Sequence, residues 1–438
     1  MDAKKKLVIL TADAGFGHRV AAQAVERAVL ERYGDAVAVT TVNLLDDPKT
    51  PRILRDSQSD YDKLVRRAPE LYQIGYMASD DSITTAIGEG ALAVGLYQAA
   101  AAMLREQQPD AIISTYPLYS AALNSAFDSK GYRVPLLLVI TDLVTVHQIW
   151  YNRRVDYCMV PTESVAQQAM NAGIPAERIF LTGIPVNPQM SQRPADRNEL
   201  RTSLGWQTAP KTFLAVGSKR VKQLLPVLNV LNHYGGEVQL AVVCGRDEEL
   251  FRELSAVDWH IPVKLYQFVE NMAPLLHAAD AIICKAGGLI TTEALACGLP
   301  MLIIEVIPGQ EEGNASYVVE HEAGEFVKSP VEALEVIHHW LQQDGAELGM
   351  ARGRAAAIGR PDAAYAIADL CWQALQIGPR KLENPARQVI DTLVSNVHQV
   401  REEIKSELAL WDHEQFQLFL GELENNLKEI ASHRRHHR

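Results

Sequence analysis

The sequence predicts an α/β protein built from two Rossmann-like domains that face a cleft, with a helical extension after them. Three observations lead to this prediction. The chain has 438 residues, which is too many for one ordinary hydrophobic core. Short β-branched runs alternate with stretches of helical periodicity, as is typical of parallel sheets covered by helices. A proline-rich stretch interrupts this alternation near the middle of the chain, and the same alternation then starts again.

The composition is that of a globular protein, with 47% hydrophobic and 22% charged residues. The formal net charge of −12 argues against a general nucleic-acid binder, so we expect no nucleic-acid partner. The 5 cysteines are scattered without a C-x-x-C pair, which favours reduced core cysteines and a cytoplasmic location. No signal peptide is recognisable, and no apolar run approaches the roughly 20 residues that span a bilayer.

The first domain is expected over residues 1–187. Its predicted helices include His18–Tyr33, Thr84–Gln107 and Ser164–Ala172. Pro185, Pro188 and Pro194, with Asn, Gln and Ser residues between them, read as a linker. The predicted strands of this domain are Leu7–Thr11, Val37–Val42, Ala111–Ser114, Leu136–Ile140, Tyr157–Val160 and Ile179–Gly183.

The second domain is expected over residues 195–350, followed by closing helices over 351–380. Residues 385–438 show apolar positions at helical spacing and predict an extension of two helices. Glutamates line the polar face of these helices, so packing or self-association through residues 385–430 is favoured over membrane binding. The predicted strands of the second domain are Phe213–Val216, Val238–Val243, Val263–Tyr266, Ala281–Cys284 and Met301–Ile304.

The turn after the Ala281–Cys284 strand carries the clearest functional signal. Gly287 and Gly288 stand where this strand gives way to a helix, so the backbone can approach a ligand closely and the helix end can bind an anion, best a phosphate. Glu293 follows about one turn later, where its carboxylate could hold hydroxyl groups. A second polar glycine turn follows over residues 308–314. Together these features predict a nucleotide-sugar site, since neither a G-x-G-x-x-G nor a P-loop pattern is present.

A comparable turn follows the first predicted strand. Gly15-Phe16-Gly17-His18 leads from the strand into a helix and places an imidazole at the helix start. A neutral imidazole is a suitable general base for a hydroxyl group, and the helix N-terminus disfavours its charged form. We therefore predict His18 to be a catalytic base in the interdomain cleft.

A third loop follows the Leu136–Ile140 strand and carries Asp142, His147 and Trp150, which are expected to line the same face. The alternative is that Trp150 packs in the core and His147 is an ordinary loop residue. Neither a nucleophile elbow nor a metal-ligand spacing such as H-E-x-x-H is present, which disfavours hydrolase and metalloenzyme functions.

Taken together, these segments resemble the monogalactosyldiacylglycerol synthases and related diacylglycerol glucosyltransferases, which share a family with the lipid-linked peptidoglycan N-acetylglucosaminyltransferase. The likeness keeps the same order from about residue 5 to residue 375 and does not cover the extension. The matching segments are Gly15–Arg19, Gln108–Ser114, Thr141–Trp150, Pro161–Glu163, Thr182–Val186, Cys244–Arg246, Lys285–Gly288 with Glu293–Ala294, Gly298–Pro300 and Pro308–Asn314.

The resemblance implies a GT-B fold and an inverting, metal-independent transfer of galactose or glucose from a UDP-sugar to diacylglycerol. It implies no cofactor other than the UDP-sugar co-substrate. His18 would be the base, and Gly17, Asp142, His147 and Trp150 would lie on the acceptor side. The implied donor-side residues are Gly217, Phe268 with its backbone at the uracil, Gly287, Gly288, Leu289 and Ile290 at the diphosphate, Glu293 at the ribose, and Gln310 and Glu311 at the sugar hydroxyls.

The resemblance also implies a membrane-contacting region that would meet an anionic membrane surface. It would comprise the basic segment 49–67 and the apolar helix 83–104, which suits an enzyme peripheral to the membrane. The alternative is a solvated basic loop.

One segment departs from the family pattern. Where relatives carry a glycine-rich loop, this chain has Gly217 followed by Ser218, Lys219, Arg220 and Lys222. These cations could grip phosphate, or the donor could have changed, or activity could have been lost. The rival functions are therefore transfer to another lipid-linked acceptor, a UDP-sugar 2-epimerase and a non-catalytic binding protein.

Overall fold

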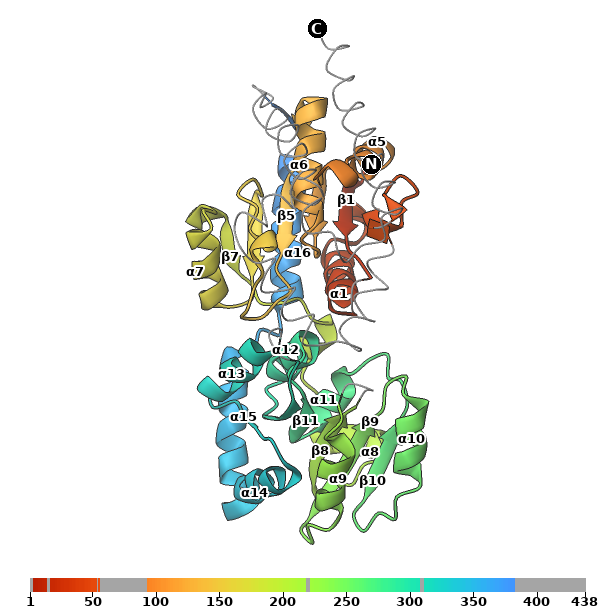
Figure 1. Cartoon of the computed structure of the whole chain (residues 1–438), viewed down its shortest axis with the longest axis vertical. Coiled ribbons are helices and arrows are strands. Elements are labelled where there is room, and N and C mark those ends of the chain that lie inside the picture. The colour runs from red at the N-terminus through yellow and green to blue at the C-terminus, as the bar shows by residue number, and fades with distance from the viewer. Residues whose placement is uncertain are drawn as a thin grey trace, which may run out of the picture. The chain divides into compact units, whose positions relative to one another are not determined.

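The computed structural model describes residues 3–13, 16–52, 54–55, 93–217, 221–307 and 311–382, which form two α/β units (Figure 1). Unit 1 comprises Met1–Asp142, Val146–Pro185 and Ala364–Arg438, and unit 2 comprises Leu143–Thr145 and Val186–Ala363. The two units do not follow the chain in simple succession, because the chain returns to unit 1 after unit 2. The predicted extension over 385–438 lies outside the described residues.

Unit 1 is built on a parallel sheet of six strands in the order β2-β1-β3-β5-β6-β7. Three of these strands have the bounds that the sequence predicts, and the others differ from the prediction by one or two residues at one or both ends. The prediction succeeds because the central strands are continuous apolar runs buried on both faces, as a covered parallel sheet requires. The strands are β1 (Lys5–Leu10), β2 (Val37–Val42), β3 (Ala111–Ser114), β5 (Leu136–Val139), β6 (Tyr157–Val160) and β7 (Ile179–Leu181).

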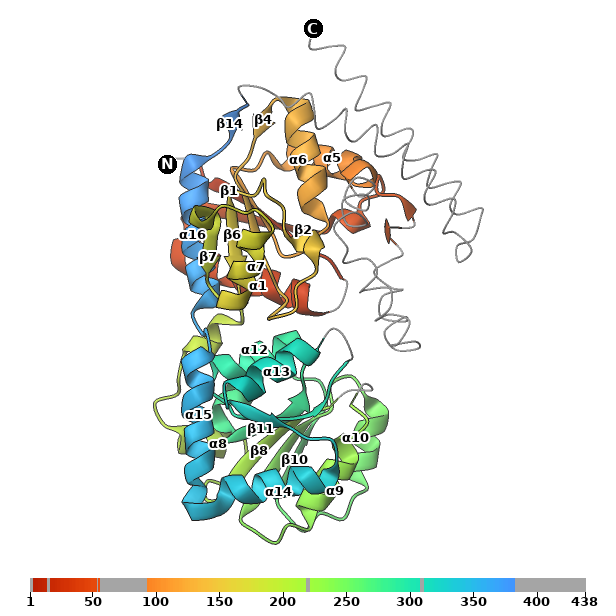
Figure 2. The same cartoon turned by 60° about the vertical axis from the view of Figure 1, so that its left-hand side comes forward.

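Helices cover both faces of this sheet. On one face, α1 (Phe16–Tyr33) packs with α16 (Ala363–Ile377), and Figure 2 shows α16 in blue alongside the strands. On the other face pack α5 (Tyr97–Gln107), α6 (Tyr119–Lys130) and α7 (Glu163–Asn171). The described part of the predicted 84–107 helix is thus a buried core element. The short strands β4 (Tyr132–Arg133) and β14 (Arg380–Lys381) pair antiparallel, and neither is predicted from the sequence.

Unit 2 has its own parallel sheet in the order β10-β9-β8-β11-β12-β13. All five predicted strands are present, and two of them have the predicted bounds. The sixth, β13, has only three residues, too few for an apolar pattern to reveal it. The strands are β8 (Lys211–Val216), β9 (Val238–Val243), β10 (Val263–Tyr266), β11 (Ala281–Lys285), β12 (Met301–Glu305) and β13 (Gly324–Phe326).

The helices of unit 2 form a layer on each face of the sheet. The first layer contains α8 (Arg197–Ser203), α11 (Ala273–Ala278), α12 (Gly288–Ala296), α13 (Glu312–Glu320) and α15 (Ala346–Ile358). The second contains α9 (Leu224–Asn232), α10 (Glu248–Ser255) and α14 (Pro330–Leu341). Of the helices that the sequence analysis groups as closing helices over 351–380, α15 therefore belongs to unit 2 and α16 to unit 1.

Each sheet reverses its strand order once. In unit 1 the reversal lies between β1 and β3, and in unit 2 it lies between β8 and β11. Helices that follow the two strands at such a point run to opposite faces, which leaves a crevice at the carboxyl ends of those strands. The turns singled out in the sequence, at His18 and at Gly287, follow β1 and β11. The fold therefore places both at the positions where doubly wound sheets bind ligands.

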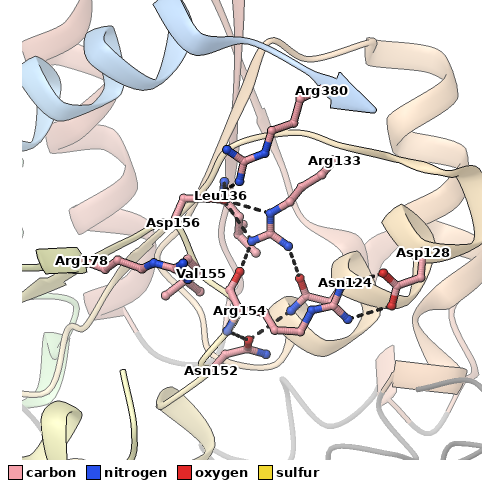
Figure 3. Close-up of polar contacts among 10 residues, drawn as sticks. All are labelled: Asn124, Asp128, Arg133, Leu136, Asn152, Arg154, Val155, Asp156, Arg178 and Arg380. Carbon is pink, nitrogen blue, oxygen red and sulfur yellow. Dashed lines mark hydrogen bonds and ion pairs between the residues drawn. The ribbon is translucent and has the colours of Figure 1, made fainter. Parts of the chain in front are cut away.

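The amino end of the first sheet is closed by a polar network (Figure 3). The Arg133 guanidinium lies 3.0 Å from the Asp156 carboxylate and donates to the Asn124 side chain at 3.1 Å. Arg380 of β14 donates to the other Asp156 oxygen at 2.8 Å. Arg154 binds Asp128 of α6 through two hydrogen bonds of 2.7 and 2.6 Å. The network joins β4, α6, the loop before β6 and the strand that follows α16, so it fixes the end of unit 1 opposite the crevice.

All five cysteines are buried and unpaired by disulfides, as the sequence analysis predicts. None of the helices in the described ranges combines the length and the hydrophobicity that crossing a bilayer requires.

The network predicts a large stability loss when its central cation is removed. Arg133→Met leaves the Asp156 carboxylate without its most buried partner, and we expect the free energy of unfolding to fall by about 3 kcal/mol. Chemical denaturation of the full chain measures this loss. Arg105→Met is the matched control, because Arg105 pairs with Glu106 on the surface and both side chains are mostly exposed. A loss no larger than that of the control would contradict the assigned role of the network.

Candidate functional site

The donor-side candidate residues gather at the carboxyl end of β11. Gly287 is the N-cap of α12, and among the residues that the structure describes no side chain caps this helix end. The first bond of the helix runs from the Thr291 N–H to the Gly287 carbonyl at 3.0 Å. The N–H groups of Gly288, Leu289 and Ile290 therefore point out of the helix end, where the helix dipole is positive. This end of α12 has the donors and the partial charge that a phosphate group requires.

Glu293 lies in the second turn of α12 and is 7% exposed. Within the described residues no hydrogen bond to its carboxylate is present. Burial raises the pKa of Glu293 from its usual 4.5 to about 7. A buried carboxyl without a protein partner is costly, so a ligand with hydroxyl groups would relieve the cost. These properties suit the predicted ribose contact.

Glu311 is also buried, and the protein itself satisfies it. One carboxylate oxygen forms an ion pair with the Lys285 ammonium, and the other accepts the Ile307 N–H at 3.0 Å. Close by, the Asn314 side chain donates to the Ala286 carbonyl at 2.9 Å and so holds the loop before α12. The predicted contact between Glu311 and a sugar therefore needs a change of partners.

Two further predicted donor residues lie at the ends of neighbouring strands. Phe268 follows β10 and is 55% exposed, with the Arg246 guanidinium 4.9 Å from the centre of its ring. Strands are about 4.8 Å apart, so the end of β10, three strands away in the sheet, is about 14 Å from that of β11. Gly217 follows β8, where a side chain would clash with Leu224 and Leu250. Both contacts are with the ends of leucine side chains, so a larger residue at this position requires those side chains to shift.

Parts of both predicted loops fall outside the described residues. Gln310 and Gly309 lie there, as do Ser218, Lys219 and Arg220. The predicted sugar contact of Gln310 stays a prediction.

The imidazole of His18 is held at the crevice of unit 1. Its Nδ1 lies 2.9 Å from the Thr115 carbonyl oxygen and 2.9 Å from the Thr141 hydroxyl. The Thr115 hydroxyl donates to the backbone carbonyl of His18 at 3.0 Å. The Tyr116 ring packs edge-on, with 5.0 Å between the ring centroids. Gly17 precedes His18 in the first turn of α1, and a side chain there would meet no neighbouring atom within 4 Å.

The partners of His18 determine which ring nitrogen can act as a base. A carbonyl oxygen cannot donate, so Nδ1 carries the proton in its bond to Thr115. Nε2 is then unprotonated and holds a lone pair. Burial lowers the pKa of His18 from 6.5 to about 4, against a smaller raising effect of the Thr115 bond. The imidazole is therefore neutral throughout the physiological pH range.

The loop after β5 holds the acceptor-side candidates Asp142, His147 and Trp150 through contacts of its own, and Trp150 lies near His18. Asp142 accepts the Trp150 indole N–H at 2.7 Å, and Trp150 itself is buried in the core, 6.0 Å from His18 between ring centroids. Burial raises the pKa of Asp142 to about 6, which the bond from Trp150 opposes. His147 caps the short turn Gln148–Trp150 by accepting the Ile149 N–H at 3.2 Å. These contacts position the loop, and the roles toward an acceptor stay predictions.

Several residues at the two crevices are not found by sequence reasoning. Thr115 and Thr141 follow apolar strands, which is the signal that could have indicated them. Lys285 belongs to a matching sequence segment, but its pairing with Glu311 is not visible in the sequence. Glu305 ends β12 beside Lys285, and its Oε2 is buried without a hydrogen-bond partner among the described residues. No group of three or more His, Cys, Asp or Glu side chains that could ligate a metal occurs within the described part of the chain.

Two family models match the chain. The model described as "Monogalactosyldiacylglycerol (MGDG) synthase" matches residues 18–186, and the model "Glycosyltransferase family 28 C-terminal domain" matches residues 213–353. The first match begins at His18, and the second includes β11, α12 and Glu311.

Named relatives match over most of the chain. A probable monogalactosyldiacylglycerol synthase of Glycine max, named as chloroplastic, is 33% identical over 373 residues, covering 83% of this chain and 70% of the relative. The spinach (Spinacia oleracea) monogalactosyldiacylglycerol synthase is 32% identical over 376 residues, covering 84% and 72%. Monogalactosyldiacylglycerol synthase 3 of Arabidopsis thaliana is 31% identical over 383 residues, covering 83% and 80%.

Solved structures share the fold at low sequence identity. MurG of Acinetobacter baumannii matches with a TM-score of 0.54 and 17% identity, covering 85% of this chain and 100% of that chain. A UDP-GlcNAc 2-epimerase from Neisseria meningitidis matches with a TM-score of 0.53 and 14% identity, covering 84% and 100%. These likenesses show that the chain has the predicted GT-B fold class, with a Rossmann-like sheet in each unit.

The buried state of Glu293 predicts a specific dependence of stability on pH. Because its pKa is raised from 4.5 to about 7, the folded state binds the proton more tightly than the unfolded state. The resulting loss of stability grows as pH rises from 4.5 to about 7 and is constant above that. Glu293→Gln removes this cost, so the variant should be more stable than the wild type at pH 8 by on the order of 3 kcal/mol and equally stable near pH 4.

Thermal and chemical unfolding of the free protein at both pH values test this expectation. Glu325→Gln is the control, since Glu325 is exposed on β13. If the stability difference between Glu293→Gln and the wild type is the same at pH 4 and at pH 8, the pKa of Glu293 is not raised.

Proposed function

Because the chain belongs to the monogalactosyldiacylglycerol synthase family, we propose that it transfers galactose from UDP-galactose to diacylglycerol with inversion at the anomeric carbon. It is a UDP-sugar-dependent glycosyltransferase that makes a glycosyl-diacylglycerol. The observation that carries the proposal for this chain's own site is the N-terminus of α12 beside the buried Glu293, since neither has a side-chain hydrogen-bond partner among the described residues. One binds phosphate and the other binds hydroxyl groups, which a nucleoside diphosphate offers together.

His18 supplies the base of the proposed reaction. Its unprotonated Nε2 takes the proton of the free hydroxyl of diacylglycerol as that oxygen bonds to the anomeric carbon. The bond from the anomeric carbon to the UDP oxygen breaks on the opposite face of the sugar, and UDP leaves with the electron pair. The proton passes from Nε2 to solvent. The Thr115 carbonyl keeps the ring in the required tautomer and orientation.

The departing diphosphate meets fixed positive charge in unit 2. The N–H groups at the start of α12 are held in place by the helix and stabilise developing charge without reorganising, and the nearby Lys285 ammonium adds positive charge. We propose that these groups act without a metal ion, and that the UDP-sugar is the only co-substrate besides the lipid.

The acceptor requires access to a membrane, so we propose that the enzyme binds the membrane peripherally. The basic segment 49–67 is the proposed contact with anionic lipids, since each Lys or Arg near such a surface contributes about 1 kcal/mol. Most of this segment lies outside the described residues. Self-association through residues 385–430 stays a prediction, because these residues lie outside the described ones.

Sequence identity favours the proposed function over that of a UDP-sugar 2-epimerase. The synthases match at 30% or more, whereas the epimerase of Neisseria meningitidis shares 14% and so indicates the fold alone. Transfer of glucose, and transfer to another lipid-linked acceptor, are outcomes of the test below.

Transfer is tested by incubating the full chain with radiolabelled UDP-galactose and vesicles that contain diacylglycerol. We expect label in the organic phase, and a lower yield with UDP-glucose. If label reaches the organic phase only from UDP-glucose, the donor is UDP-glucose and not UDP-galactose. No label from either donor, although UDP binds, would refute transfer to diacylglycerol.

Replacing His18 tests the base. His18→Ala should lower kcat by about 100-fold or more, because a positioned base contributes that much, and should leave UDP affinity unchanged. His321→Ala is the control, since His321 ends α13 on the surface. With a pKa of about 4, His18 should cause no fall in kcat/KM between pH 8 and pH 5.5. Wild-type turnover in His18→Ala would exclude its role as base.

A further inference from the structure

The ion pair between Lys285 and Glu311 lies beside the N-terminus of α12. A methyl group placed on Gly287 would come 2.7 Å from the Lys285 Nζ and 3.5 Å from a carboxylate oxygen of Glu311. Gly287 is the N-cap of this helix. Both charged groups therefore lie against the backbone that would receive a diphosphate.

In this arrangement the Glu311 carboxylate lies where an anionic ligand would bind. It accepts from an ammonium and from one backbone N–H, and it lies beside a positive helix end. The Lys285 side chain is 20% exposed and that of Glu311 is 7% exposed, so water screens the pair weakly. The ammonium gains from any stronger anion that reaches the helix end, because a diphosphate carries more charge and more acceptor oxygens than a carboxylate.

We propose that Lys285 exchanges its carboxylate partner for the donor diphosphate, and that this exchange frees Glu311 to bind a hydroxyl of the sugar. The inference rests on the proposed function and names a positioning device within the same donor site. Lys285 then has two roles. It neutralises the diphosphate, and it withholds Glu311 from ligands that bring no diphosphate.

The exchange couples two recognition steps. Glu311 keeps the Ile307 N–H on one oxygen in both states, so only the oxygen now paired with Lys285 becomes available. A sugar without UDP cannot displace the ammonium, because its neutral hydroxyls offer no charge in return. Glu311 is thus delivered to the sugar only after the diphosphate is bound.

Calorimetric titration with UDP and with uridine tests the role of Lys285. Lys285→Gln should weaken UDP binding by about tenfold or more and flatten its dependence on salt, because a charge-assisted contact is lost. Uridine has no phosphate, so its affinity should not change. Lys264→Gln, on the exposed side of β10, is the matched control.

Glu311→Gln tests the exchange itself. Removing the competing carboxylate should strengthen UDP binding by several-fold, while the extra affinity of UDP-galactose over UDP should fall. In the double variant that combines Lys285→Gln and Glu311→Gln, the gain in UDP affinity should disappear, because this gain acts through Lys285.

The outcomes separate this inference from the proposed function. Unchanged UDP affinity in Lys285→Gln, or an equal loss for uridine, would overturn the role of Lys285. Weaker UDP binding in Glu311→Gln would overturn the exchange. Wild-type protein that binds UDP but transfers no sugar would refute the proposed function and leave the exchange standing.

Discussion

The single reversal of strand order in each parallel sheet is the constraint on which both candidate sites depend. Between β1 and β3, and between β8 and β11, successive helices leave for opposite faces of the sheet. The backbone at those strand ends is therefore not covered by the connection of the neighbouring strand. His18 reaches the Thr115 carbonyl only because β1 and β3 are adjacent, although the residues are 97 positions apart in the chain. In unit 2 the same rule brings the turn of Gly287 beside the end of β8.

Buried polar groups have partners at one set of strand ends and lack them, among the described residues, at another. At the amino end of the first sheet, Arg133, Asp156 and Asn124 satisfy one another, as buried charges must if they are to cost little. At the carboxyl end of the second sheet, Glu293 has a raised pKa and one oxygen of Glu305 has no partner within the described residues. Unsatisfied buried groups of this kind lower stability and are retained where a ligand completes them. The contrast distinguishes a satisfied polar network, which stabilises unit 1, from the partly unsatisfied groups of unit 2, where we propose that the donor binds.

Sequence patterns predict most strands because a strand in a covered parallel sheet is a continuous apolar run, as in Leu136–Val139. They miss Gly324–Phe326 and Tyr132–Arg133, which are too short to show a pattern. They also cannot assign the helix Ala363–Ile377 to unit 1. Its periodicity shows an apolar face but not which sheet that face covers. For the candidate site, glycine turns and His18 are visible as motifs. The partners of Lys285 and of His18 are not, since each contact joins separate segments and depends on rotamers that no spacing encodes.

Two carboxylates beside the proposed diphosphate site present an electrostatic problem, because like charges repel most strongly where water is scarce. The structure keeps each of them from acting as a full negative charge in a different way. Burial raises the pKa of Glu293 to about 7, so a large fraction of it is protonated and neutral near physiological pH. Glu311 is paired with Lys285 as long as no diphosphate is bound, and in the proposed exchange a sugar hydroxyl takes the place of the ammonium. A protonated carboxyl can donate to a hydroxyl as well as accept from one. In the proposed donor complex, Glu293 would thus bind a hydroxyl group without repelling the diphosphate.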